Sequence, residues 1–177
     1  MPFTPYHIGP ALFLGLLFLN FIDFPTFLIA SVIVDVEPFL VLFFNLNYPL
    51  HGFFHSLLGG TLVAIPLAIV MFKIRDKLSP LMSYFRLGQK VSFKSILLAS
   101  FLGIYIHILL DSRIYTDIQP FYPSPYNPLL TTGILAGLDS YVICIWSFFG
   151  AVIIYIIRLF FLNFRNTWLD FFISYFI

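Results

Sequence analysis

Long apolar runs with almost no charged residue inside them dominate this sequence and limit what it can fold into. A transmembrane helix needs about 20 mostly apolar residues, and fewer suffice where a segment is packed inside a bundle. Five runs come close to that length, so we expect an all-α polytopic membrane helix bundle of about five spans. The expected spans are Ile8 to Ile22, Phe24 to Phe44, Phe53 to Phe72, Ser95 to Leu110 and Tyr141 to Leu162.

Composition supports this class. Of the 177 residues, 60% are hydrophobic and only 10% are charged, whereas a soluble domain carries about 25% charged residues. The length suffices for one bundle, so residues 1-177 are expected to form a single integral membrane domain. The formal net charge of +1 argues against nucleic acid as a partner. We therefore expect a multi-pass protein of the cell membrane, surrounded by membrane lipid.

Positive residues are concentrated between the third and fourth expected spans. Six of the nine lysines and arginines lie between Lys73 and Lys94, and such residues near span ends are retained in the cytoplasm. This predicts a cytoplasmic loop. The N-terminus, the loop Asn45 to His51 and the long loop Asp111 to Ser140 would then lie on the extracytoplasmic side. The apolar tail Trp168 to Ile177 is too short to span and is expected at the membrane interface.

All four histidines fall on the predicted outer side. His51 and His55 are four residues apart, which on a helix places both imidazoles on one face, as two nitrogen ligands for one ion. His107 and Asp111 repeat this spacing with a carboxylate. The alternative for each pair is a helix-end residue hydrogen-bonded to a neighbour. Within a membrane span, however, an ionisable residue is costly and is a functional candidate by default.

Two carboxylates interrupt the second apolar run. Asp35 and Glu37 precede Pro38, which removes a helical donor and moves Glu37 away from helical geometry, so the second span is expected to break at Asp35-Pro38. Carboxylates two apart on an intact helix point to different faces, whereas a break allows both to turn inward. Arg113, a histidine or a divalent cation would compensate their charge.

The donors are nitrogen and oxygen without a thiolate, which suits zinc or another first-row divalent ion better than calcium. Four imidazoles and three carboxylates exceed what one tetrahedral ion needs. A two-metal site, or one metal with a free carboxylate as general base, would use the surplus. The predicted metal ligands are His7, Asp35, His51, His55, His107 and Asp111, and Glu37 is either a further ligand or the general base.

Three other polar features carry expectations. Arg113 is the only positive residue on the predicted outer side and would bind a substrate phosphate. Asp23 and Asp139 begin spans and are expected to be helix caps. The segment Asp117 to Pro128 is rich in proline and tyrosine, so an ordered lid over the outer face is expected there.

Four motifs occur in order along about the first 130 residues. They are Thr4-Pro-Tyr-His7-Ile-Gly-Pro, Ala30-Ser-Val-Ile-Val-Asp35-Val-Glu37-Pro, His51-Gly-Phe-Phe-His55-Ser and His107-Ile-Leu-Leu-Asp111-Ser. This set resembles the predicted membrane-bound metal-dependent hydrolases of bacteria and archaea. That family is similar to zinc-dependent phospholipase C and nuclease P1, so the resemblance implies an all-helical site that hydrolyses phosphoesters. The sequence departs from the family at Glu37-Pro38, where many relatives carry an aspartate followed by a histidine.

Together these patterns predict a membrane-embedded metal-dependent hydrolase acting on a phosphoester or lipid-like substrate at the extracytoplasmic interface. Two alternatives remain: a non-catalytic metal-binding membrane protein, and a metal or proton transporter, because buried carboxylates in broken helices also line ion pathways. Transport needs polar groups in both membrane halves. The expected cytoplasmic halves Leu62 to Phe72 and Ser95 to Tyr105 carry no acid or histidine, which favours the enzyme.

Overall fold

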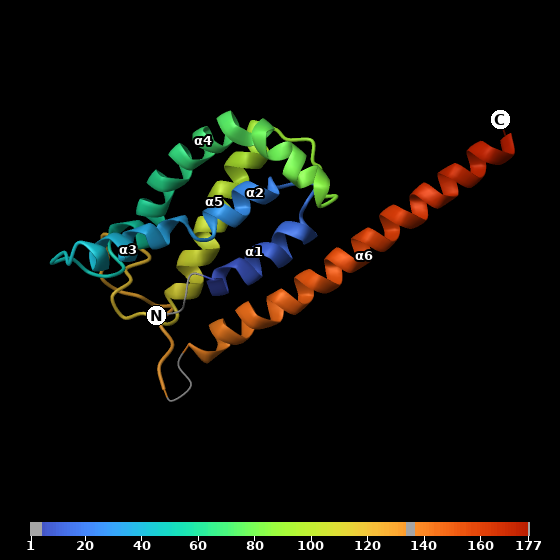
Figure 1. The fold of residues 1–177 in the computed structure, drawn as a ribbon. Helices are drawn as coiled ribbons and strands as arrows, with labels where there is room; N and C mark the ends of the chain where they lie inside the picture. Colours follow the sequence, from blue (N-terminus) through green and yellow to red (C-terminus); the bar gives the residue numbers. More distant parts are fainter. Residues whose placement is uncertain (1–4, 134–136, 177) are drawn as a thin grey trace.

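The computed structural model describes residues 5–133 and 137–176. The described residues form helices and contain no strand, so the expected all-α class is confirmed. Figure 1 shows the arrangement. The α-helices are α1 (Pro5–Leu17), α2 (Phe24–Ala30), α3 (Val36–Phe43), α4 (Leu57–Tyr84), α5 (Phe93–Asp111) and α6 (Leu138–Phe176), and two short 3-10 helices cover Ile33–Asp35 and Phe53–His55.

Four helical segments in the described part of the chain are long and apolar enough to cross a membrane. They are Phe24–Phe43, which joins α2 to α3, the helices α4 and α5, and Leu138–Phe164 of α6. The first helix, α1, has only 13 residues, about 20 Å of helix against a hydrocarbon core of about 30 Å. The bundle thus has four full-length candidate spans and one short apolar helix where five spans were expected.

The break in the second span lies earlier than expected. Helix α2 ends at Ala30, a 3-10 turn covers Ile33–Asp35, and α3 begins at Val36. Pro38 is the third residue of α3. Backbone N–H groups in the first turn of a helix have no acceptor within the helix, so a proline there costs no helical hydrogen bond. Pro38 therefore helps to begin a helix, and Glu37 is helical, contrary to the expectation.

Helix α4 continues through residues that were expected in a loop. It has 28 residues and includes Lys73 and Lys77, so only residues 85–92 connect it to α5. Pro66 and Pro80 lie inside it, and each removes one helical hydrogen bond and favours a bend. The ribbon of α4 arches over the bundle accordingly (Figure 1).

A buried polar network joins α2 to α4 at this basic end of the molecule. Asp23 caps α2 by accepting hydrogen bonds from the Thr26 amide at 3.2 Å and the Thr26 hydroxyl at 2.5 Å. The other oxygen of Asp23 accepts from Nε of Arg75, and both side chains are buried. Gln89 reaches from the α4–α5 connection to donate to the Ile22 carbonyl at 2.7 Å. The expected capping role of Asp23 is confirmed, but its ion pair was not foreseen.

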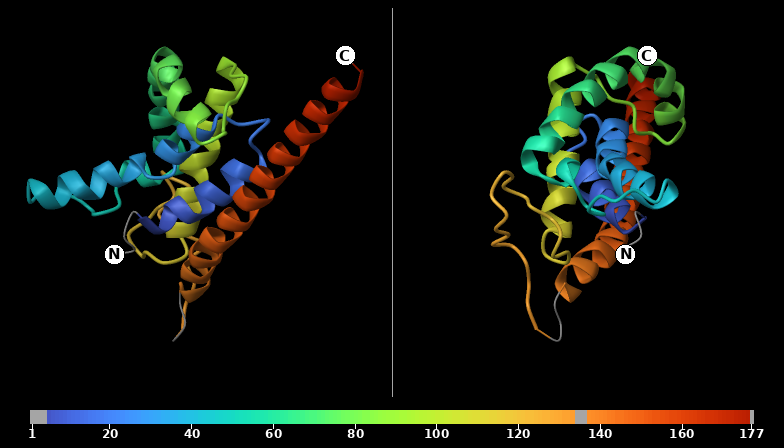
Figure 2. Two further views of the ribbon diagram at one scale, coloured as in Figure 1. Left: turned by 45° about the vertical axis from the view of Figure 1, so that its right-hand side comes forward. Right: turned by 90° about the vertical axis from the view of Figure 1, so that its left-hand side faces the viewer.

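Helix α5 is the centre of the fold, with α2 and α4 packed against it, while α1 packs against α6 (Figure 2). Gly103 permits the closest approach: a Cβ there would lie 2.5 Å from Cβ of Ala30 and 2.9 Å from the Phe27 carbonyl oxygen. Small residues at helix crossings let backbones approach in this way. The end of α2 is thereby held against α5 one turn before His107.

Helix α6 is much longer than the bundle it packs against. Its 39 residues correspond to about 58 Å of helix. Figures 1 and 2 show its C-terminal part projecting away from the other helices. Residues 168–176 continue this helix and do not form the separate segment that was expected; the interfacial location of the tail remains a prediction.

Candidate metal centre

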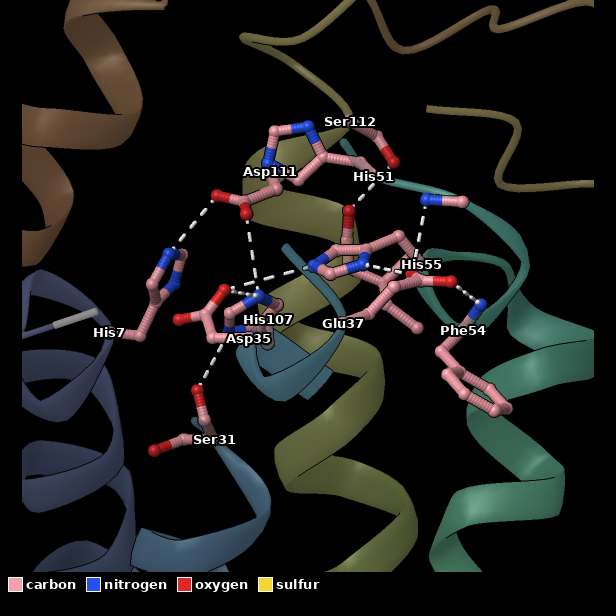
Figure 3. Close-up of polar contacts among 12 residues, drawn as sticks. His7, Ser31, Asp35, Glu37, His51, Phe54, His55, His107, Asp111 and Ser112 are labelled. Atoms are coloured by element: carbon pink, nitrogen blue, oxygen red, sulfur yellow. Dashed lines mark hydrogen bonds and ion pairs between the residues drawn. The ribbon is translucent and has the colours of Figure 1, made fainter. Parts of the chain in front are cut away.

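Four side chains converge at the C-terminal end of α5, opposite the basic end of that helix. His107 and Asp111 come from α5 itself, Asp35 from the turn between α2 and α3, and His55 from the turn that precedes α4. One ligand atom from each lies within 4.8 Å of the others, as Figure 3 shows. We call this set (Asp35, His55, His107 and Asp111) the quartet. It is a group that could hold a metal ion, as the sequence predicted for these four residues.

Three distances within the quartet are close to the edge of a coordination tetrahedron. Nε2 of His107 lies 3.3 Å from Oδ1 of Asp35 and 3.3 Å from Oδ2 of Asp111. Nε2 of His55 lies 3.8 Å from the same Asp35 oxygen. Bonds of about 2.0 Å at tetrahedral angles place two ligand atoms about 3.3 Å apart. Two of the three separations equal this value, and the third, from His55 to Asp35, is 0.5 Å longer.

The far nitrogen of each quartet histidine has a hydrogen-bond acceptor beside it. Nδ1 of His107 lies 2.7 Å from the Ser31 carbonyl oxygen, which can only accept a hydrogen bond, so this nitrogen carries the proton. Nδ1 of His55 lies 2.8 Å from Oε2 of Glu37 and donates in the same way. Each Nε2 is buried, makes no hydrogen bond with the described residues and points at carboxylate oxygens. Nε2 is therefore the ring atom that is left to bind a metal ion placed between the histidines and the carboxylates.

Glu37 lies behind His55 and outside the quartet. Its carboxylate accepts hydrogen bonds from the Gly52 amide at 3.1 Å, the Phe54 amide at 3.1 Å and the His55 ring. These contacts hold the turn that carries His55. The geometry thus gives Glu37 a positioning contact to a ligand histidine; its roles as a ligand or as the general base remain predictions.

His51 lies beside the quartet and does not share a helix with His55. The chain bends at His51, a 3-10 helix covers Phe53–His55, and α4 begins only at Leu57, so the expected helical pairing of the two histidines is wrong. Their rings still meet, with centroids 4.9 Å apart. Nδ1 of His51 lies 3.0 Å from Oδ1 of Asp117. Burial, followed by the neighbouring His55, lowers the pKa of His51 below its ordinary value of 6.5.

His7, near the start of α1, reaches the quartet through Asp111. Its Nε2 lies 3.0 Å from Oδ1 of Asp111, while the other Asp111 oxygen faces His107. The His7 ring also packs on the His107 ring with centroids 4.0 Å apart. The structure therefore brings His7 to the predicted site, in contact with two quartet residues, Asp111 and His107, but outside the quartet itself.

Arg113 is engaged in an ion pair. Its guanidinium pairs with Asp139 in the first turn of α6, and both side chains are partly exposed. Asp139 was expected to act as a helix cap: its Oδ1 accepts from the Ser140 amide in the first turn of α6 at 3.0 Å, while its Oδ2 pairs with Arg113. The Arg113 carbonyl accepts from the amide and hydroxyl of Thr131, at 3.1 and 2.6 Å. Binding of a substrate phosphate by Arg113 remains a prediction, and it would compete with Asp139.

The segment after α5 is irregular and is anchored by hydrogen bonds, and its role as a lid over the outer face remains a prediction. The Leu57 amide donates to the Pro120 carbonyl at 2.9 Å, and Asn127 donates to the Ser112 carbonyl at 2.8 Å. Two residues of this segment approach the site without having been predicted as part of it. Asp117 holds His51, and Tyr115 packs its ring on His51 with centroids 4.1 Å apart.

Tyr115 presents a hydroxyl that is buried and has no hydrogen-bond partner among the described residues. Burial raises the pKa of this phenol above its ordinary value of 10, so the hydroxyl keeps its proton at neutral pH and acts as a donor. Its position four residues after Asp111 was a signal that the sequence offered, since that spacing returns a side chain to the same side of a helix or helical turn.

A cavity of about 330 Å³ adjoins the site on the His51 side. Its lining combines aromatic and uncharged polar side chains with one carboxylate. The lining residues are Tyr48, Pro49, His51, Gly52, Phe53, Ser56, Asp117, Gln119 and Tyr122.

Comparison with protein-family models, with curated proteins and with solved structures finds no match for this chain.

Proposed function

We propose that this protein is a membrane-embedded hydrolase that cleaves a phosphoester bond of a lipid-like substrate. In this proposal the quartet binds a divalent metal ion, which we take to be zinc. The observation that carries the proposal is the pair of imidazoles whose Nδ1 atoms donate to Ser31 and Glu37 and whose Nε2 atoms face Asp35 and Asp111.

The donor chemistry fits such an ion. Two carboxylates balance a charge of +2, and two neutral imidazoles complete a set of nitrogen and oxygen donors that suits zinc. Acceptors behind ligand histidines fix the tautomer and raise ligand basicity, and they are a recurrent feature of metal sites. When bound, a divalent ion supplies Lewis acidity, which polarises a phosphoryl oxygen and makes water a stronger acid.

A catalytic role is favoured by polar groups next to the quartet that metal binding alone would not need. His51 lines the adjacent cavity, and Asp117 holds its Nδ1 proton. Its Nε2 is then free to accept a proton, the arrangement of a histidine general base oriented by a carboxylate. Tyr115, which keeps its proton, is suited to donate to negative charge that develops on the substrate.

The chemistry balances with these residues. Hydrolysis joins the oxygen of water to phosphorus and breaks the phosphorus–oxygen bond to the leaving alcohol. Nε2 of His51 takes one proton from the water and returns it to the alkoxide of the leaving group. In this proposal the general base is His51, and Glu37 acts through its contact with His55.

Metal analysis and hydrolysis, measured on the same purified samples in detergent, test the proposal. Wild type should contain metal and cleave phospholipid in a manner that a chelator abolishes. His55→Ala should lose both metal and activity, whereas His51→Ala should keep the metal and lose about 10² to 10⁴ in rate. Asp76→Ala, which removes an exposed acid of α4, is the control and should change neither.

Two results would overturn the proposal. Hydrolysis that survives both the chelator and His55→Ala would exclude the metal mechanism. Bound metal without hydrolysis of any phospholipid or isoprenoid phosphate offered would favour the alternative of a metal that only stabilises the fold.

A further inference from the structure

The cavity beside His51 (about 330 Å³) is small for a ligand pocket. Ligand pockets span about 300–1,000 Å³, so this one has room for a polar head group and not for an entire lipid. It lies next to the quartet because His51 belongs to its lining and packs against His55. One substrate could therefore place a head group in the cavity and the neighbouring scissile bond at the quartet.

The charge of the cavity disfavours an anion. Among the described residues no lysine or arginine lines it, and Asp117 contributes a carboxylate. Even a protonated His51 would only cancel that charge. The neighbouring carboxylates Asp35, Glu37 and Asp111 exceed the charge of one divalent ion by one, so the region as a whole remains negative. Negative surroundings favour a cationic group.

The aromatic lining suits the same kind of group. Tyr48, Phe53 and Tyr122 surround the cavity, and the rings of Phe53 and Tyr122 meet edge to face with centroids 5.2 Å apart. The Tyr48 hydroxyl accepts a hydrogen bond from the Phe53 amide at 2.9 Å, which fixes the position of that ring. Faces of aromatic rings attract ammonium groups, and the attraction is largest where water is excluded.

Exposed aromatic rings lie on α3 and on the segment that connects it to the cavity. Tyr48 is 47% exposed, and the stacked rings of Phe39 and Phe43 on α3 are 61% and 70% exposed. Figures 1 and 2 show α3 and the segment after it extending away from α5 on this side of the molecule. In a membrane, this surface would lie against acyl chains.

Resting on the proposed function, we propose that the substrate is a zwitterionic lipid whose ammonium-bearing head group occupies this cavity, with its phosphate at the quartet and its acyl chains along α3. The carboxylate of Asp117 and the rings of Tyr48 and Tyr122 recognise the ammonium group. Substrates with several negative charges and no ammonium group, such as isoprenoid diphosphates, are disfavoured by the same charges.

Binding of choline to metal-free protein tests the cavity without any need for hydrolysis. Wild type should bind choline chloride more tightly than glycerol in a calorimetric titration in detergent. Tyr122→Leu should weaken choline binding about tenfold, whereas Tyr122→Phe, which keeps the ring, should stay within about twofold of wild type. Tyr126→Leu is the matched control, because Tyr126 belongs to the same lid and does not line the cavity.

Choline binding no tighter than glycerol binding, or an equal loss in Tyr122→Leu and Tyr126→Leu, would overturn the inference. Cleavage of phosphatidylethanolamine and phosphatidylglycerol by metal-loaded protein separates the two proposals. Preference for phosphatidylethanolamine that Tyr122→Leu abolishes supports both. Choline binding without any cleavage would leave the cavity assigned and reject the hydrolase, while equal cleavage of both lipids without choline binding would do the reverse.

Discussion

At the scale of single residues, the centre depends on acceptors that orient its two histidines. Ser31 offers a backbone carbonyl to His107, and Glu37 offers a carboxylate to His55. Glu37 also accepts hydrogen bonds from the Gly52 and Phe54 amides. One carboxylate therefore fixes both the orientation of the His55 ring and the conformation of the turn that carries it. The basicity of the His55 nitrogen that faces the quartet therefore depends on a residue that does not reach the metal position.

Replacing Glu37 separates its possible roles. Glu37→Gln keeps the size of the side chain but removes a carboxylate acceptor, so metal affinity should fall about 10- to 100-fold. Competition with a chelator of known affinity measures this, with Asp76→Asn as the control. If the metal affinity of Glu37→Gln stays at the wild-type value while hydrolysis is lost, Glu37 is the general base and His51 is not.

At the scale of helices, the crossing of α2 and α5 sets the geometry of the centre. Gly103 meets Ala30 and Ser31, and the Ser31 carbonyl binds His107 one turn further along α5. A displacement of α2 relative to α5 would therefore change the position of the acceptor that orients the His107 ring.

Gly103→Ala should show this transmission. The added Cβ would lie 2.5 Å from Ala30 and 3.1 Å from the Ser31 amide nitrogen, and the backbone of α2 must move to relieve the overlap. We expect a lower unfolding midpoint together with weaker metal binding. Gly88→Ala is the matched control, because a Cβ there meets only the Ser83 hydroxyl oxygen at 3.7 Å. Unchanged metal affinity in Gly103→Ala would show that the crossing does not position His107.

The Asp23–Arg75 pair joins α2 to α4 at the basic end of the molecule. Arg75→Met leaves a buried carboxylate without its cation, which should destabilise the protein by about 3–5 kcal/mol. The double variant Asp23→Asn/Arg75→Met should recover most of that loss, and Lys73→Met on the exposed face of α4 should be near neutral. Denaturation in detergent measures all three. A double variant no more stable than Arg75→Met would mean that the arginine contributes by packing and not by charge.

At the scale of the whole molecule, the helices separate two ends of different chemistry. The quartet lies at the C-terminal end of α5, and the basic segment 85–92 lies at its N-terminal end. Because positive residues are retained in the cytoplasm, the quartet end is predicted to face outward.

Cysteine labelling checks this orientation. Ser83→Cys and Ser124→Cys introduce thiols at exposed positions near the basic and the quartet end, respectively, in a Cys144→Ala background that removes the native thiol. A membrane-impermeant reagent added to intact cells should label Ser124→Cys only. Labelling of Ser83→Cys alone would invert the topology.

The sequence by itself determined the membrane class and the local pair on α5. Apolar runs make the helical class unavoidable, because lipid offers no partner to backbone polar groups. His107 and Asp111 were predicted to lie on one face of a helix, and they do so because their spacing is a property of the helix alone. The capping role of Asp23 is local in the same sense, since its partner is three residues away.

Only the tertiary structure decided how the remaining residues share the site. His51 and His55 have the same spacing as the α5 pair, yet α4 begins too late to include them, and a turn held by Glu37 brings His55 alone into the quartet. The partners of Glu37 and His51 lie 15 to 18 and 66 residues away, respectively. Such contacts depend on how separate segments pack, and no periodicity along the chain encodes which oxygen meets which nitrogen.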